Sequence, residues 1–345
     1  MSEYYDGTKL LSLMDINGKK PEIYICTSNR SAGKTTYFNR LAVKKYIEKK
    51  EKFCLLYRYN YELDDCADKF FKDIQILFFR SHSMHSERRA SGIYHELFLD
   101  DIPCGYAISM NSADQIKKYS HFFSDTKRII FDEFQSETNK YCPNEIKKFI
   151  SIHTSIARGN GEQSKYLPVY MISNPVSLVN PYYLELGISE RLKDNTRFLK
   201  GNGFVLEQGF NESASKAQKE SGFNKAFSDN KYVSYSTENV YLNDNKAFIE
   251  NPTGKNRYIC TIKYDNIEYG IREYADNGYL YVNQIADTTF PIKITTTTND
   301  HNVNYVMLKR NAPFISTLKL YFEKGAVRFK DMRSKEAFLS MLKYN

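Results

Sequence analysis

Residues 23–36 decide the fold, and they read Ile23–Tyr24–Ile25–Cys26–Thr27–Ser28–Asn29–Arg30–Ser31–Ala32–Gly33–Lys34–Thr35–Thr36. An apolar, β-prone run ends in small polar residues, and Gly33–Lys34–Thr35 then opens an amphipathic helix. In a phosphate-binding P-loop, backbone N–H groups of the turn and of the helix N-terminus surround the phosphates. The P-loop pattern is G-x-x-x-x-G-K-[ST], and Ser28 replaces its first glycine here. Because serine fits the turn at negative φ, the departure weakens the match without removing it.

The P-loop pattern assigns a role to each part of this loop. Lys34 would reach the β- and γ-phosphates of a nucleotide, and the Thr35 hydroxyl would hold Mg²⁺. The Gly–Lys–Thr tripeptide is common, however, so the loop alone leaves nucleotide binding open. The residues expected to surround the phosphates are Ser28, Asn29, Arg30, Ser31, Ala32, Gly33, Lys34, Thr35 and Thr36.

A second element supports the nucleotide interpretation. Residues 127–134 form an apolar run that ends in the adjacent carboxylates Asp132 and Glu133. In a P-loop ATPase the strand-end aspartate organises the Mg²⁺ shell, and a following glutamate can polarise the attacking water. The alternative is a buried strand that ends in a solvated acidic turn. The two motifs together favour a Mg²⁺-dependent ATPase.

Strand-like and helix-like segments alternate between residues 21 and 174, as in a mainly parallel α/β sheet. Between the P-loop and Asp132 the chain has room for at least one further strand, which is typical of P-loop ATPases with an inserted strand and a catalytic glutamate. The expected strands are residues 23–27, 52–59, 74–80, 92–99, 104–110, 127–132 and 167–174; the expected helices are 33–49, 62–72, 111–122 and 143–157.

The amino-acid composition changes in the later part of the chain. Residues 201–230 are rich in Gly, Asn and Ser and predict a linker between an ATPase domain at 1–200 and a C-terminal domain at 231–345. That domain should be α+β. Its expected strands are residues 257–264, 267–274, 279–284, 295–298 and 327–329, and its expected helices are 312–324 and 334–344.

The composition argues against a zinc-binding, a disulfide-stabilised and a membrane-spanning protein. The 345 residues carry a formal net charge of +8 and six scattered cysteines without a C-x-x-C pair, so neither a zinc site nor a disulfide framework is expected. Residues 301–345 hold nine Lys/Arg against three Asp/Glu, which suggests either contact with a polyanion or a solvated helix face. No run approaches the roughly 20 apolar residues of a membrane span, and no signal pattern precedes the P-loop, so a cytoplasmic location is expected.

Two motif blocks carry a family resemblance. Residues 129–134 (Ile–Ile–Phe–Asp–Glu–Phe) and 172–183 (Ile–Ser–Asn–Pro–Val–Ser–Leu–Val–Asn–Pro–Tyr–Tyr) resemble the DNA-packaging (encapsidation) ATPases of phi-twenty-nine-type short-tailed phages, relatives of large terminase subunits. The arginine inside the P-loop, Tyr57–Arg58–Tyr59 and Tyr269–Gly270 are similar too. The segment between Arg158 and Ser173 is longer than this family leads us to expect.

This resemblance implies an ATP-driven motor that moves double-stranded DNA into a prohead from the portal vertex. The motor would be a homo-oligomeric ring, expected to be a pentamer, in the host cytoplasm, with a packaging RNA as a further candidate partner. The C-terminal domain would have an RNase H-like fold that has lost its nuclease chemistry. The turn positions of Asp265 and Asp276 and the odd spacing of Glu268 and Glu273 agree with that loss.

The resemblance also implies further site residues. Arg30 would sense the γ-phosphate, Asn174 would report its loss, and Arg158 would be an arginine finger. Lys117 and Lys118 would face the DNA backbone, although a solvated helix face explains either lysine alone. Tyr4 or Tyr5 could stack on adenine or simply pack.

Two other classes of function remain open from sequence. A P-loop helicase or recombinase would share the ATPase core but would unwind or pair strands. A non-hydrolysing, basic DNA-binding scaffold would keep the P-loop only as a relic. Hydrolysis of ATP with and without double-stranded DNA separates these hypotheses.

Overall fold

The computed structural model describes residues 4–138, 140–158, 163–189, 191–192, 196–238, 241, 248–307 and 312–342. The chain divides into two compact units, residues 1–243 and 244–345. Each unit has its own sheet and its own apolar core. The expected α/β class, with a smaller α+β unit after it, is confirmed.

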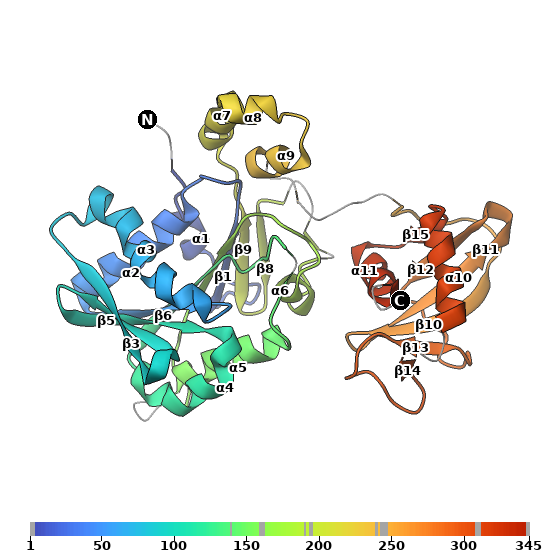
Figure 1. The fold of residues 1–345 in the computed structure, drawn as a ribbon, viewed down its shortest axis with the longest axis horizontal. Helices are drawn as coiled ribbons and strands as arrows, with labels where there is room; N and C mark the ends of the chain where they lie inside the picture. Colours follow the sequence, from blue (N-terminus) through green and yellow to red (C-terminus); the bar gives the residue numbers. More distant parts are fainter. Residues whose placement is uncertain are drawn as a thin grey trace. The chain divides into compact units, whose positions relative to one another are not determined.

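The first unit is built on a nine-stranded sheet of order β3-β4-β5-β2-β6-β7-β1-β9-β8 (Figure 1). The six central strands, from β5 to β9, pair in parallel, whereas β3, β4 and β8 form antiparallel edges. The strands are β1 (Ile23–Thr27), β2 (Lys52–Tyr57), β3 (Met84–Arg89), β4 (Tyr94–Leu99), β5 (Ile102–Ser109), β6 (Thr126–Asp132), β7 (Val169–Ser173), β8 (Phe198–Gly201) and β9 (Phe204–Gln208).

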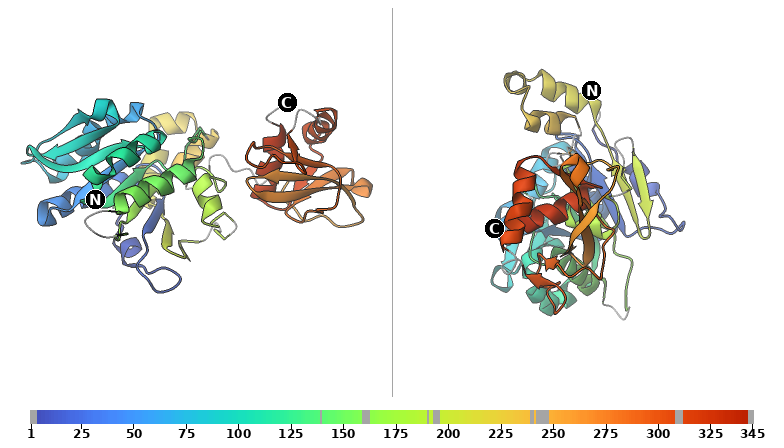
Figure 2. Two further views of the ribbon diagram at one scale, coloured as in Figure 1. Left: turned by 90° about the horizontal axis from the view of Figure 1, so that it is seen from below. Right: turned by 90° about the vertical axis from the view of Figure 1, so that its right-hand side faces the viewer.

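Helices cover both faces of this sheet (Figures 1 and 2). Tyr24 and Cys26 of β1 pack into one apolar cluster with α2 and α3, while Ile25 packs into a second cluster with α4 and α5. A strand buried on both faces has apolar residues without alternation, and that is the pattern of β1. The helices are α1 (Thr8–Ser12), α2 (Lys34–Lys49), α3 (Tyr61–Phe78), α4 (Ala113–Ile116), α5 (Glu145–Ala157) and α6 (Pro181–Glu185), with 3₁₀ turns η1 (Ala90–Gly92), η2 (Met110–Ser112) and η3 (Lys117–Phe123).

The expected strand at residues 74–80 is wrong, because α3 continues through Phe78. Phe70, Phe71 and Ile74 are buried at helical spacing, which extends the helix through an apolar run that also fits a strand. The basic segment between the expected strands at 74–80 and 92–99, to which the sequence assigned no strand, contains β3, which pairs with β4. His85, Arg88 and Arg89 therefore belong to an edge strand.

Residues 201–230, expected to be a linker, contain regular structure. β9 pairs in parallel with β1, so this interval completes the sheet of the first unit. Figure 1 shows the three helices that follow grouped beyond one end of β1 and β9. They are α7 (Glu212–Glu220), α8 (Gly222–Ala226) and α9 (Lys231–Thr237).

The second unit has a six-stranded sheet of order β14-β13-β10-β11-β12-β15. The expected meander is present, and Asp265 and Asn266 both have positive φ in the tight turn between its first two strands. The elements are β10 (Arg257–Tyr264), β11 (Ile267–Tyr274), η4 (Ala275–Asn277), β12 (Tyr279–Asn283), β13 (Lys293–Thr295), β14 (Val306–Met307), α10 (Ala312–Glu323), β15 (Val327–Phe329) and α11 (Met332–Leu342).

Within the described residues, no helix is both long and apolar enough to cross a membrane.

The close approach of β5 to β2 predicts a stability effect. A Cβ atom on Gly105 would lie 2.3 Å from the carbonyl oxygen of Phe53, so Gly105→Ala must push the two strands apart. We expect this substitution to lower the free energy of unfolding by about 1–3 kcal/mol, measured by denaturant titration followed by circular dichroism. Gly222→Ala is the control, because no atom lies within 4 Å of that Cβ position. Equal stability of the two variants would contradict the packing described here.

Candidate nucleotide-binding site

The sheet order brings the sequence motifs to one edge. β7 lies between β1, which leads into the P-loop, and β6, which ends at Asp132. Thr27 pairs with Ser173, and Asp132 pairs with Ile172. Because the carboxyl ends of parallel strands meet at the same edge, the P-loop, Asn174 and Asp132 are neighbours. In the sheet, β7 is the strand inserted between β1 and β6, and Asn174 follows it directly. The strands that separate the P-loop from Asp132 in the sequence, β2 to β5, lie on the other side of β6.

Lys34 is buried at the centre of this edge. Its Nζ donates to the Ser28 carbonyl at 3.0 Å, to Ser28 Oγ at 3.0 Å, to the Asn29 carbonyl at 3.2 Å and to Asn174 Oδ1 at 3.2 Å. Burial lowers the pKa of Lys34. The lysine thus connects the P-loop to the end of β7 through oxygen atoms.

The P-loop backbone explains which positions need glycine. Gly33 has φ +92° at the start of α2, and Ser31 has φ +60°. Ser28 is not among the residues with positive φ, so the position lost from the glycine pattern does not require glycine here. Its hydroxyl instead accepts a hydrogen bond from Lys34.

Asp132 and Glu133 follow β6 on the same side. The Thr35 hydroxyl donates to the Asp132 carboxylate, and burial raises the pKa of Asp132. Glu133 has φ +53°, and its backbone N–H donates to Asp132 Oδ1 at 2.9 Å. Shielding from solvent, and then the carboxylates of Asp132 and Glu137, raise the pKa of Glu133.

The oxygen donors of Thr35 and Asp132 fit a magnesium ion. Mg²⁺ prefers oxygen ligands and is usually held by one or two carboxylates together with substrate phosphates. The described residues contain no cluster of three or more His, Cys, Asp or Glu side chains that could hold a metal. A site with a single carboxylate and one hydroxyl agrees with both observations.

A buried ion pair contacts the backbone of the turn at Glu133. Arg58 Nε lies 3.1 Å from Glu145 Oε1, and its Nη1 and Nη2 donate to the backbone carbonyls of Glu133 at 3.3 Å and Phe134 at 2.7 Å. The Tyr182 hydroxyl donates to Glu145 Oε1 at 2.7 Å. The sequence alone assigned no role to Arg58 or Tyr182, although Tyr182 lies in one of the two motif blocks and Arg58 lies in a further segment similar to the family.

Arg30 is already paired within the chain. Its Nη2 donates to Glu137 Oε1 at 2.8 Å, and its guanidinium lies 5.4 Å from the centre of the Tyr232 ring. Glu137 also accepts hydrogen bonds from the hydroxyls of Tyr232 at 3.2 Å and Tyr235 at 2.9 Å. Helix α9 thereby joins the P-loop to the turn after Glu133.

The N-terminal end of the P-loop is tied to α7. Asn29 Nδ2 donates to the Asn211 carbonyl at 3.1 Å, and the Asn211 N–H donates to Asn29 Oδ1 at 2.9 Å. Gln218 Nε2 donates to Ser31 Oγ at 2.6 Å. Tyr235 also shares a hydrogen bond with Asn174, which connects α9 to the end of β7. The sequence did not predict these contacts, because the Gly- and Asn-rich composition of residues 201–230 is typical of a linker.

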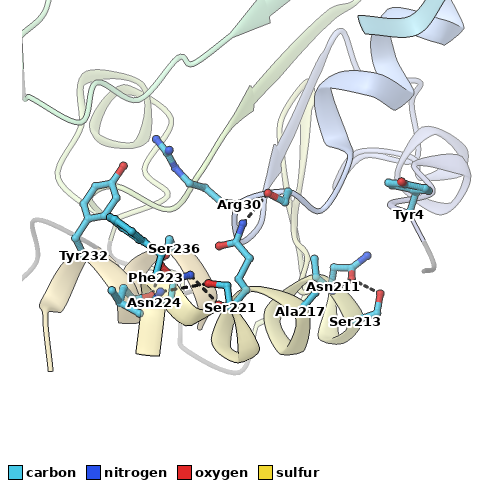
Figure 3. A pocket seen from close by; sticks show the side chains of 14 residues that line it. Tyr4, Arg30, Asn211, Ser213, Ala217, Ser221, Phe223, Asn224, Tyr232 and Ser236 are labelled. Carbon is cyan, nitrogen blue, oxygen red and sulfur yellow. Dashed lines mark hydrogen bonds between the residues drawn. The ribbon is translucent and has the colours of Figure 1, made fainter. Parts of the chain in front are cut away.

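A pocket of about 610 Å³ opens between the P-loop and these helices (Figure 3). Arg30, Ser31, Gln218 and Tyr232 are among the residues that line it. Tyr4 lies on its far side in Figure 3, and a Cβ added to Gly33 would come within 3.0 Å of the Tyr4 ring. The two tyrosines therefore differ: Tyr4 is exposed and lines the pocket, whereas the Tyr5 ring packs beside Tyr37 and Phe38 and its hydroxyl donates to Glu207.

Three predicted residues lie away from this site. Arg158 is exposed and follows α5, whose last carbonyl accepts from the N–H of Lys165 close to the start of β7. It therefore lies at the opposite edge of the sheet from the P-loop. Lys117 and Lys118 are exposed on η3, where Lys117 Nζ lies 3.3 Å from Asp114 Oδ1.

Comparison with known proteins places the chain in a family. Residues 1–343 match the family described as Podovirus DNA encapsidation protein (Gp16). The DNA packaging protein of Bacillus phage phi29 is 24% identical over 332 residues, covering 95% of this chain and 93% of that protein. The DNA packaging protein of Bacillus phage PZA is 25% identical over 332 residues with the same coverage.

Solved structures agree with that assignment at the level of fold. A chain of the bacteriophage Phi-29 viral genome packaging motor assembly has a TM-score of 0.69 and 22% identity, covering 98% of this chain and 99% of that chain. A chain of the Phi-28 gp11 DNA packaging motor has a TM-score of 0.62 and 18% identity, covering 99% and 98%. The protein described here therefore belongs to the podovirus DNA encapsidation (Gp16) family.

Proposed function

We propose that this protein hydrolyses ATP to move double-stranded DNA, as a ring motor that packages a phage genome through the portal of a prohead. The observation that carries the proposal is the buried Lys34, which joins the P-loop to Asn174 beside Asp132 and Glu133. The residues proposed to bind the phosphates, the cation and the attacking water thus lie at one edge of the sheet. Membership of the encapsidation family supplies the DNA substrate class.

The geometry supports a division of roles. Backbone N–H groups of residues 28–36 and the Lys34 ammonium would hold the β- and γ-phosphates. Mg²⁺ held by Thr35 and Asp132 would neutralise phosphate charge. Glu133 would orient and deprotonate the attacking water, a role that a raised pKa favours because it brings the base closer to the operating pH.

Coupling to movement would pass through Asn174 and α9. Asn174 Oδ1 accepts from Lys34, and the Asn174 side chain also bonds to Tyr235. A phosphate that draws Lys34 or Arg30 toward itself must break contacts with Asn174 or Glu137. Loss of the γ-phosphate would restore them. In this account Arg30 releases Glu137 when it senses the γ-phosphate, and α9 moves with it.

Two exposed lysines are proposed to contact DNA, and the remaining proposals concern the partners and the C-terminal unit. Lys117 and Lys118 would contact DNA phosphates, which carry no sequence information and suit a motor that must move over every sequence. The ring is proposed to be a pentamer working in the host cytoplasm, with a packaging RNA as a further candidate partner. The C-terminal unit is proposed to be an RNase H-like domain without nuclease activity.

Lys34→Ala and Glu133→Gln should both abolish turnover, by different routes. Loss of Lys34 removes charge that binds phosphate, so nucleotide affinity falls as well. Glu133→Gln keeps the size of the side chain but removes the base, so ATP still binds while turnover falls by about 10²-fold or more. Lys44→Ala, an exposed neighbour on α2 paired with Glu48, is the control. Rates would be measured with and without double-stranded DNA; an absence of hydrolysis under both conditions would favour the scaffold hypothesis.

Glu137→Gln should move the acid limb of the activity profile. Glu133 works as a carboxylate, so activity is lost as pH falls through its pKa, which here is raised. Removing the Glu137 charge lowers that pKa, and the midpoint of kcat/KM should shift to lower pH. Glu238→Gln, which removes an exposed carboxylate paired with Lys219, is the control. A midpoint unchanged or shifted to higher pH would exclude Glu133 as the titrating base.

Arg158→Ala should fold and bind ATP but hydrolyse it poorly. Its position at the far edge of the sheet prevents it from reaching its own P-loop, so it would act on a neighbouring subunit, where an arginine finger contributes roughly 10³-fold or more. Lys147→Ala, an exposed cation on the same helix, is the control.

Mixed rings test whether Arg158 acts between subunits. Arg158→Ala subunits keep an intact catalytic site, and Glu133→Gln subunits still offer Arg158. Part of the activity should therefore return when the two inactive variants are assembled together. Rings with no recovery would contradict a finger supplied in trans.

A further inference from the structure

A second cavity, of about 390 Å³, lies away from the pocket beside the P-loop. It is bounded by Tyr24 near the start of β1, Arg128 near the start of β6, Tyr170 near the start of β7 and Lys45 in the second half of α2. The P-loop follows the carboxyl end of β1, so the two cavities are at opposite edges of the same sheet.

The walls of this cavity are strongly basic. Lys20, Lys45, Lys127 and Arg128 line it, against the single carboxylate of Glu51 among its lining residues. These four cations come from three separate places in the sequence, and the fold brings them together. A concave site with one sign of charge concentrates the opposite ion.

Arg128, which lines the cavity, has buried hydrogen-bond donors without acceptors in the part of the chain that the structure describes. Its side chain is 92% buried and pairs through Nη2 with Glu51. Nε and Nη1 are also buried, and neither has a hydrogen-bond partner among the described residues. A guanidinium carries five N–H donors, which pair with carboxylate and phosphate oxygens. Nε and Nη1 lie on different edges of the group, and each edge also includes Nη2. Buried donors left without acceptors are costly, so these atoms call for an oxyanion.

The aromatic wall adds no competing charge. Tyr166 donates to the Pro21 carbonyl at 2.9 Å, and Lys20 Nζ lies 4.3 Å from the centre of its ring. Burial raises the pKa of Tyr170 to about 12 and raises the pKa of Tyr166 as well. Both phenols therefore stay neutral at physiological pH. Tyr166 already donates its proton to Pro21, so Tyr170 is the phenol that can donate to a ligand.

We propose that this cavity binds a phosphate group, with the Arg128 guanidinium, Lys45 and Lys127 as the cations that hold it. The phosphate could be free inorganic phosphate or part of a nucleic-acid backbone, since both present the same oxygens. The backbone source depends on the proposed function in DNA packaging, whereas the phosphate site itself does not.

Binding of inorganic phosphate to the full chain tests the site. The protein would carry Lys34→Ala, so that phosphate binding at the P-loop is weakened, and titrations would be compared with chloride at equal ionic strength. We expect one phosphate per chain by calorimetry and a rise in Tm that chloride does not reproduce. Adding Lys45→Ala or Lys127→Ala should weaken binding about fivefold or more, whereas Lys44→Ala should not. Equal affinity in all four proteins would overturn the proposal.

Glu51→Gln in the same background gives a test that misfolding cannot imitate. It removes the carboxylate that both repels phosphate and occupies Nη2 of Arg128. Phosphate affinity should therefore rise, by about fivefold or more. An unchanged or lower affinity in a variant with an unchanged circular dichroism spectrum would contradict the role of Arg128.

A short DNA duplex separates the two sources of phosphate. If the DNA backbone is the natural ligand, the duplex displaces inorganic phosphate, and Lys45→Ala weakens duplex binding more than Lys44→Ala does. If phosphate stays bound at saturating duplex, the site takes the free ion. Neither result depends on ATP hydrolysis, so failure of the phosphate site and failure of the proposed motor function are distinguishable.

Discussion

The rest of the structure depends on the need of one buried ammonium group for oxygen partners. Lys34 finds them in two carbonyls and a hydroxyl of its own loop and in the amide of Asn174. Meeting that need requires β7 beside β1, and it places Asp132 one strand further along. The parallel order of these three strands is therefore what converts separated sequence motifs into one site.

The candidate nucleotide site is also supported by residues that do not line the pocket beside the P-loop. The buried Arg58–Glu145 pair holds the carbonyls of Glu133 and Phe134, and Tyr182 satisfies the glutamate. Breaking such a pair leaves an uncompensated buried charge, which typically costs 3–5 kcal/mol. Glu133 can keep its positive φ because the hydrogen bonds from Arg58 to the carbonyls of Glu133 and Phe134 fix the conformation of this turn.

Sequence alone could predict the α/β class, most strands and the two motifs of the site, because a strand followed by a glycine- or acid-rich turn has a strong local signature. It assigned the end of α3, from Ile74 to Phe78, to a strand, since a short apolar run fits either period. It also missed the contacts of α7 and α9 with the P-loop. Asn211 and Gln218 lie in the Gly- and Asn-rich interval 201–230, and Tyr235 lies in the interval that the sequence assigned to the C-terminal domain. Only tertiary pairing shows what these residues bind.

Hydrogen exchange with and without a non-hydrolysable ATP analogue and Mg²⁺ tests most directly whether the edge around Lys34 is the nucleotide site. We expect slower exchange at the backbone N–H groups of residues 28–36, together with a change in α9, because phosphate must displace the contacts that Lys34 and Arg30 now make. The same regions should be unaffected in Lys34→Ala. Protection confined to other parts of the chain, or none at all with saturating nucleotide, would contradict this expectation.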